Sequence, residues 1–192
     1  MDQIFRDETF DKRDFKEDHL PKGEYEKCVF TNCDFSGSDL AEIIFWECEF
    51  RSCNLSLAKL TKTAFREVKF TNCKMLGLHF NDCNKFALAF SFENCLLHHS
   101  SFYQAKLKGT VFKNTQLHEA DFAQCDLTGA VFEHCDFMGA SFDNTTLEKA
   151  DLRSSVNYSI DPSLNKIKKA KFSLSGISGL LDKYDIEIDT LQ

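Results

Sequence analysis

A large apolar residue returns at every fifth position between residues 111 and 152, and a small residue precedes each one by two positions. This period matches neither a helix, which repeats about every 3.6 residues, nor a strand, which repeats about every two. Tandem units of this kind must turn the chain at regular intervals and stack, so the repeat predicts a solenoid. The large residues are Phe112, Leu117, Phe122, Leu127, Phe132, Phe137, Phe142, Leu147 and Leu152.

If each five-residue unit forms one side of a square, four units complete a coil, and residues about 20 apart lie above one another at roughly the 4.8 Å strand spacing. The large and small residues then point inward. The registers before Phe80 and after Phe92 differ by two, which predicts a two-residue insertion and a bulge between them. All 20 Phe except Phe86 fall on these registers. The predicted core ladder is Phe30, Phe50, Phe70, Phe92, Phe112, Phe132 and Leu152.

The tiling of AxFxx and CxFxx units resembles the pentapeptide-repeat proteins, and the likeness covers almost the whole chain. It implies an all-β fold, a right-handed quadrilateral parallel β-helix. Several segments resemble the Qnr-type and albicidin-resistance branch of that family, whose members protect type II topoisomerases. These segments are CNLSL at 53–57, CKMLG at 73–77, NYSID at 157–161, IKKAKFSL at 167–174 and LLDKYDIEI at 180–188.

The two ends of the chain depart from the repeat, and we expect three segments within one domain. Residues 1–27 are predicted to be an N-terminal cap, because Glu8, Arg13 and Asp18 occupy small inward positions. Burying unpaired charges is costly, so we expect no regular coil there. Charged residues and Pro21 would blunt the open edge. Residues 28–156 form the regular β-helix, and 157–192 form an irregular last coil, a helix and a dimerisation tail.

Apolar residues recur at helical spacing from Leu174 to Tyr184, which predicts a short C-terminal helix with Ser175 or Ser178 as its N-cap. Alternation around Ile186 and Ile188 predicts a terminal strand. The tail is compatible with two roles, covering the end of the core or burying against a second copy. The resemblance implies both, with a homodimer joined through the C-terminal ends. The predicted dimer interface is Leu180, Leu181, Tyr184 and Ile186.

All nine cysteines occupy the small inward position, where they are predicted to act as apolar fillers rather than as disulfides or metal ligands. The bulge near residues 84–92 is either a tolerated insertion or a partner contact. Asparagines at one corner are predicted to form side-chain hydrogen-bond ladders. They are Asn32, Asn72, Asn94 and Asn114.

The composition and motifs favour a binding protein over an enzyme. The six histidines are scattered and no nucleotide-binding or nucleophile motif is present, so we expect no catalysis, cofactor or metal. No apolar run is long enough to span a membrane, and the acidic start MDQIFRDETF does not resemble a signal peptide. We therefore expect a cytoplasmic protein without membrane contact.

Acidic charge is concentrated between residues 114 and 148, which carry seven acidic residues and no Lys or Arg. The resemblance implies a mimic of DNA that binds DNA gyrase or topoisomerase IV, counters quinolone- or albicidin-like poisons and does not itself bind nucleic acid. The alternative is a passive β-helical scaffold for another protein. The predicted topoisomerase-binding acidic face is Glu119, Asp121, Asp126, Glu133, Asp136 and Asp143.

Overall fold

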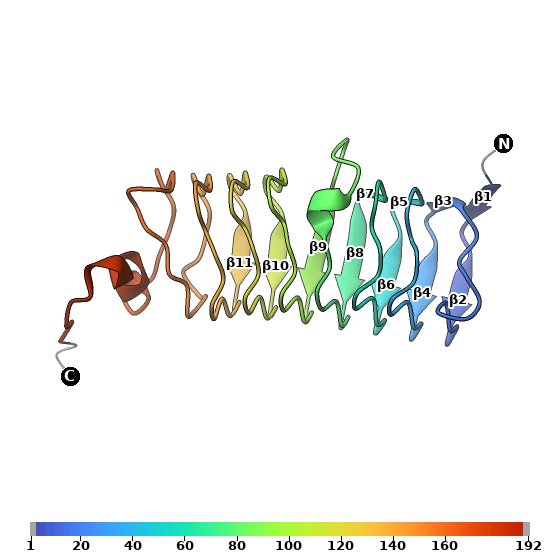
Figure 1. Cartoon of the computed structure of the whole chain (residues 1–192), viewed down its shortest axis with the longest axis horizontal. Coiled ribbons are helices and arrows are strands. Elements are labelled where there is room, and N and C mark those ends of the chain that lie inside the picture. Colours follow the sequence, from blue (N-terminus) through green and yellow to red (C-terminus); the bar gives the residue numbers. More distant parts are fainter. Residues whose placement is uncertain (1–2, 190–192) are drawn as a thin grey trace.

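The computed structural model describes residues 3–189 and shows a rod of stacked coils with one chain end at each end of the rod (Figure 1). Two parallel sheets run along it. One contains β1 (Gln3–Arg6), β3 (Gly23–Glu26), β5 (Ile44–Trp46) and β7 (Ala64–Arg66). The other contains β2 (Thr9–Asp11), β4 (Val29–Thr31), β6 (Glu49–Arg51), β8 (Val68–Thr71), β9 (Phe90–Glu93), β10 (Val111–Lys113) and β11 (Val131–Glu133).

Each coil has four sides, which we number in the order that the chain visits them from β2 onward. Side 1 is the seven-stranded sheet with its continuation through Asp151, and side 4 is the four-stranded sheet with its continuation through Lys106 and Asp126. Isolated parallel bridges hold the other two sides, such as Gln116 to Asp136 on side 2 and Asp121 to Ser141 on side 3. The predicted quadrilateral parallel β-helix is confirmed.

The core consists of columns of aromatic rings, as in the ladder on side 1. Its rings stack at 4.7 Å between Phe30 and Phe50, and at 4.9 Å between Phe112 and Phe132. Leu152 continues the same column and is fully buried. Because the rings stack on one another, the core is continuous along the rod. Within a coil, each of the four sides contributes about one large side chain to the core.

The small inward residues do more than fill space. Cys125 Sγ donates to the carbonyl of Phe102 at 2.7 Å, and Thr145 Oγ1 donates to the carbonyl of Phe122 at the same distance. These bonds join neighbouring coils, which explains why Cys, Ser and Thr alternate with Ala at this position. All nine cysteines are buried free thiols.

The corners of the coils require left-handed backbone, which Asn and Gly adopt most readily. Asn72, Asn94 and Asn114 have φ values of 55°, 54° and 48°. Asn94 Nδ2 donates to Asn72 Oδ1 at 3.1 Å, while Asn32 donates to Asp11 instead. Within residues 3–189, the predicted asparagine ladder is therefore confirmed at one step only.

The N-terminal stretch forms a coil, contrary to our expectation. β1 pairs with β3 and β2 pairs with β4, both in parallel. The charged side chains of Glu8, Arg13 and Asp18 are tolerated because, within residues 3–189, no coil stacks beneath them and they remain exposed. Whether residues 1–27 act as a separate cap stays a prediction.

The expected insertion lies between β8 and β9, where Phe70 pairs with Phe92, a step of 22 residues instead of 20. A 3₁₀ turn, η1 (Phe80–Asp82), precedes a loop at residues 84–89 that projects from the rod (Figure 1). Phe86 in this loop is 75% exposed. The insertion thus leaves the core column intact and places its extra residues outside.

The C-terminal segment differs from the prediction in two ways. The expected helix is two 3₁₀ turns, η2 (Ile177–Leu180) and η3 (Asp182–Tyr184), and its N-cap is Gly176 rather than a serine. η2 packs so closely on Tyr158 that a Cβ atom at Gly179 would lie 2.0 Å from the Tyr158 carbonyl oxygen. Residues 185–189 form no strand, because the chain turns away at Asp185 with φ of 48°.

Candidate partner-binding surface

The six predicted acidic residues do not share one face of the rod. Asp121 and Asp143 lie on side 3, Asp136 lies on side 2, and Glu119 lies at the corner between these sides. The remaining two, Asp126 and Glu133, lie on sides 4 and 1. A step of five residues moves the chain to the next side, so acids spaced by five or ten encircle the rod. We use the name acidic patch for Glu119, Asp121, Asp136 and Asp143.

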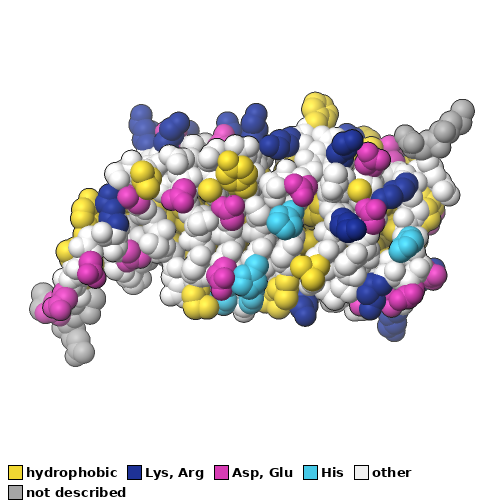
Figure 2. Space-filling view, viewed as in Figure 1, with side chains coloured by type: hydrophobic (Ala, Val, Ile, Leu, Met, Phe, Trp, Pro, Cys, Tyr) yellow, Lys and Arg dark blue, Asp and Glu magenta, His cyan; other side chains and the backbone are white. Residues whose placement is uncertain are grey.

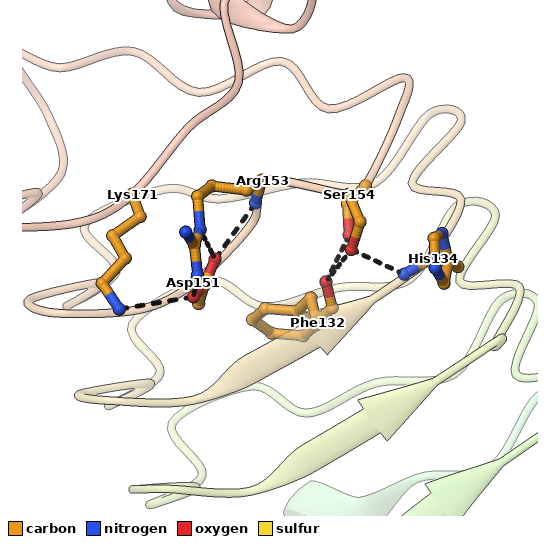
Figure 3. Close-up of polar contacts among 7 residues, drawn as sticks. Phe132, His134, Asp151, Arg153, Ser154 and Lys171 are labelled. Carbon is orange, nitrogen blue, oxygen red and sulfur yellow. Dashed lines mark hydrogen bonds and ion pairs between the residues drawn. The ribbon is translucent and has the colours of Figure 1, made fainter.

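The acids on sides 1 and 4 are balanced by cations. Lys108 Nζ lies 3.2 Å from Asp126 Oδ2. Lys113, whose Nζ pairs with Glu93 at 3.2 Å, is the in-register neighbour of Glu133. Asp151 on side 1 lies between Arg153 and Lys171, at 2.8 and 3.4 Å (Figure 3). The hydrogen bond from Arg153 outweighs partial burial and lowers the pKa of Asp151 to about 2. These acids therefore contribute little net negative charge to the surface.

Side 4 carries a surplus of lysine in the C-terminal half of the rod. Six lysines occupy stacked positions along side 4 and along its corner with side 1. The acidic residues at these positions are Asp126 and Glu148. Figure 2 shows dark-blue side chains along the upper edge of the rod in this half. We call this the lysine strip; its members are Lys106, Lys108, Lys149, Lys166, Lys168 and Lys169.

Hydrogen bonds fix two carboxylates of the acidic patch in place. Asp121 accepts bonds from the hydroxyls of Ser101 and Ser141 at 3.3 and 3.1 Å, and from the Ala123 N–H at 2.9 Å. Asp136 accepts one from Asn157 at 2.7 Å. Partial burial acts against ionisation of Asp136, but bonds from Asn157 and His118 outweigh it and hold its pKa below the usual value. Hydrogen bonds thus hold both carboxylates in fixed positions.

Three histidines adjoin the acidic patch, although the sequence alone suggested scattered histidines. The rings of His98 and His118 stack at 4.4 Å with an interplanar angle of 15°. His118 Nε2 lies 2.9 Å from Asp136 Oδ2, and His99 Nδ1 lies 3.2 Å from Glu119 Oε2. The spacing of 20 from 98 to 118, and from 99 to 119, is the signal that could have found this cluster.

The predicted dimer residues differ in exposure. Leu180 packs against the core and Leu181 is half-buried, whereas Tyr184 and Ile186 are 59% and 55% exposed. Ile188 is exposed as well and borders a shallow groove with Leu181 and Ile186. The tail therefore covers the end of the core and still presents apolar side chains to solvent.

Residues 3–189 contain no cluster of three or more side chains that could hold a metal ion. They also contain no helix that is long and apolar enough to cross a membrane. A cavity of about 560 Å³ lies between the last coils and η2, bordered by Met138, Asn157, Tyr158, Gly176 and Asp182. Tyr158 is buried beneath this segment, and nothing in the cavity lining indicates a particular ligand.

The family model described as "Pentapeptide repeat region" matches residues 24–91 and 85–152, which together span 24–152 of the 192 residues. The chain belongs to the pentapeptide-repeat family. A relative, the pentapeptide repeat protein MfpA of Mycolicibacterium smegmatis, is 49% identical over 39 residues, which is 20% of each chain. The match thus spans only a fifth of that relative.

Two solved pentapeptide-repeat structures have the same fold. Full-length QnrB1, a plasmid-mediated fluoroquinolone resistance protein, aligns with a TM-score of 0.62 at 17% identity, over 96% of this chain and all of QnrB1. HetL, a pentapeptide-repeat protein of the cyanobacterium Nostoc involved in regulating heterocyst differentiation, aligns at 0.58 with 18% identity over 90% of this chain and 85% of HetL. At this level of identity the likeness shows the fold alone.

Proposed function

We propose that the protein binds the DNA-binding groove of a type II topoisomerase, DNA gyrase or topoisomerase IV, and protects the enzyme from quinolone- or albicidin-like poisons. The observation that carries the proposal is the acidic patch, four carboxylates on two adjacent sides of a rigid rod. The Qnr-like segments of the sequence and the fluoroquinolone-resistance role named for QnrB1 support the choice of partner.

A rigid array of carboxylates is suited to a groove that normally holds DNA. Phosphates are bound mainly by Lys and Arg side chains, and these same side chains would pair with the patch. Because Asp121 and Asp136 are already held by hydrogen bonds, they lose little conformational entropy on docking. Duplex DNA carries a charge about every 1.7 Å, a density that the patch does not reach. The mimicry we propose is therefore local.

The distribution of charge also defines how the rod would dock. The lysine strip lies on side 4, which is opposite side 2, and a cationic groove would repel it. Sides 2 and 3 would face the topoisomerase, and side 4 would face away. We accordingly leave Asp126 and Glu133, with their cationic neighbours, out of the proposed contact.

We further propose a homodimer through the C-terminal ends. The exposed apolar side chains of Tyr184, Ile186 and Ile188 lie beyond the last coil, where a second copy could cover them. An isologous contact there would roughly double the length of the rod and place two acidic patches about a twofold axis.

The test compares two double variants with equal changes in charge. Glu119→Lys with Asp143→Lys alters exposed positions of the acidic patch, and Glu133→Lys with Glu148→Lys alters sides 1 and 4. The patch variant should lose binding to gyrase by at least tenfold, whereas the control should bind within about threefold of the parent. Both should keep the parental melting temperature within a few degrees, because exposed charges contribute little to stability.

A gyrase supercoiling assay with a quinolone or an albicidin-like poison supplies the second readout. The parent should restore supercoiling at poison concentrations that block the enzyme, and the patch variant should not. Equal binding and equal rescue by both double variants would refute docking by the acidic patch. Absence of binding by the parent would favour a role elsewhere, as HetL illustrates for this fold.

A further inference from the structure

The three histidines beside the acidic patch occupy stacked positions on two neighbouring columns. His98 and His118 share a column on side 2, between Leu76 and Met138 in the coils before and after. His99 lies at the adjoining corner, one coil before Glu119. Figure 2 shows histidine side chains next to acidic ones on the face in view.

Each imidazole faces a defined partner. His118 Nε2 contacts the Asp136 carboxylate at 2.9 Å, His99 Nδ1 contacts the Glu119 carboxylate at 3.2 Å, and His98 Nε2 contacts Gln116 Oε1 at 3.0 Å. The other oxygen of Asp136 is held by the neutral amide of Asn157. Two other cations lie on this side: Lys74, in the coil before His98, and Lys16, near the N-terminal end of the rod, whose Nζ pairs with Asp34 at 3.0 Å.

Protonation of these rings changes the charge of the patch. With neutral imidazoles the four carboxylates carry a charge of −4. A proton on His118 forms an ion pair with Asp136, and one on His99 forms an ion pair with Glu119, which leaves −2. The side chain that His98 contacts, Gln116, is neutral. Once His118 is protonated, its positive charge lies in a ring 4.4 Å from that of His98 and opposes protonation of His98.

We propose that His98, His99 and His118 make the acidic patch a pH-regulated surface whose affinity for a cationic partner falls as the pH falls from about 8 to about 6. Histidine is the side chain whose charge ordinarily changes in this range. That the acidic patch is a binding surface rests on the proposed function. The pH dependence itself requires only that the partner be cationic. The fold is unaffected, because the rings lie outside the core.

The experiment measures the affinity of the full chain for decalysine, and separately for gyrase, at pH 8, 7 and 6 and constant low ionic strength. Neutralising two of the four carboxylates should weaken decalysine binding by about tenfold between pH 8 and 6. The triple variant H98Q/H99Q/H118Q, which keeps hydrogen-bonding side chains, should change by less than about twofold. The matched control H19Q/H79Q/H134Q replaces the other three histidines and should behave as the parent.

Each outcome decides one question. Decalysine binding that is absent at pH 8, is flat with pH, or keeps its full pH dependence in H98Q/H99Q/H118Q would overturn the regulation. Decalysine binding that behaves as expected, with no binding to gyrase at any pH, would support the regulation and reject the proposed function. If the triple variant does not fold, the single variant His99→Gln, whose ring is 62% exposed, should remove about half of the logarithmic change.

Discussion

Replacing Phe122 by Ala tests the stacked core most sharply. The ring of Phe122 is fully buried and lies between two parallel rings, Phe102 at 4.9 Å and Phe142 at 5.3 Å. Further edge contacts join it to Phe112, Phe132 and Phe137, at 6.2, 6.3 and 6.1 Å. The substitution removes one ring from the middle of a column and leaves a cavity that the neighbouring coils cannot fill without breaking their ladders.

The expected cost follows from this environment. A Phe→Ala change in a core typically destabilises by about 3 to 5 kcal/mol, and the cost is greatest where the site cannot collapse. The loss of two stacked neighbours places Phe122→Ala in the upper half of that range, at about 4 kcal/mol. Phe122→Leu, which keeps most of the volume, should cost about 1 to 1.5 kcal/mol.

The assay is urea unfolding followed by circular dichroism, with Phe86→Ala as the matched control. Phe86 is 75% exposed, and the Arg66 guanidinium lies 5.9 Å from its ring centre. That variant should change stability by about 0.5 kcal/mol or less. Equal midpoints for Phe122→Ala and Phe86→Ala would refute the assignment of inward and outward positions.

Three further predictions concern other parts of the rod. Leu181→Asp should convert the dimer to monomers in analytical ultracentrifugation, because it places a charge in the proposed interface; a monomeric parent at micromolar concentration would exclude the dimer. The pKa of Asp151, about 2 against an ordinary 3.8, means that its ionised form stabilises the fold above about pH 4 and that this contribution is lost as the pH falls toward 2. Asp151→Asn should remove about 1 kcal/mol of acid-dependent stability, measured by urea unfolding at pH 2 to 5; an unchanged acid profile would contradict the ion pairs. Burial raises the pKa of Cys125 and Cys135 to about 12, so thiol reagents should modify the cysteines only on unfolding; rapid labelling of the native protein would contradict their burial.

The period of five is sufficient to predict the coils. A large apolar side chain such as Phe112 must point into the core, and every coil repeats the same geometry. The 22-residue step from Phe70 to Phe92 was predictable too, because the positions of the large apolar residues shift by two across the insertion. Inward and outward positions in a solenoid are thus local properties of the chain.

The ends and the surface were less predictable for physical reasons. Glu8 and Arg13 are incompatible with a coil only if their side chains are buried, whereas both are exposed and no coil of residues 3–189 lies beneath the first one. Gly176 and Gly179 permit 3₁₀ turns against Tyr158, a close approach that helical periodicity does not reveal. Closeness in sequence predicts a shared face for Asp126 and Asp136, although ten residues correspond to two sides of the square and place them on opposite sides.

The most direct test of the central proposal is competition with DNA on the topoisomerase. Fluorescently labelled duplex DNA bound to gyrase is titrated with the protein at low ionic strength, and the fraction of bound DNA is followed by anisotropy. Docking by the acidic patch predicts full displacement of the DNA, and loss of displacement for Glu119→Lys with Asp143→Lys. A ternary complex that keeps its DNA at saturating protein would contradict the proposal.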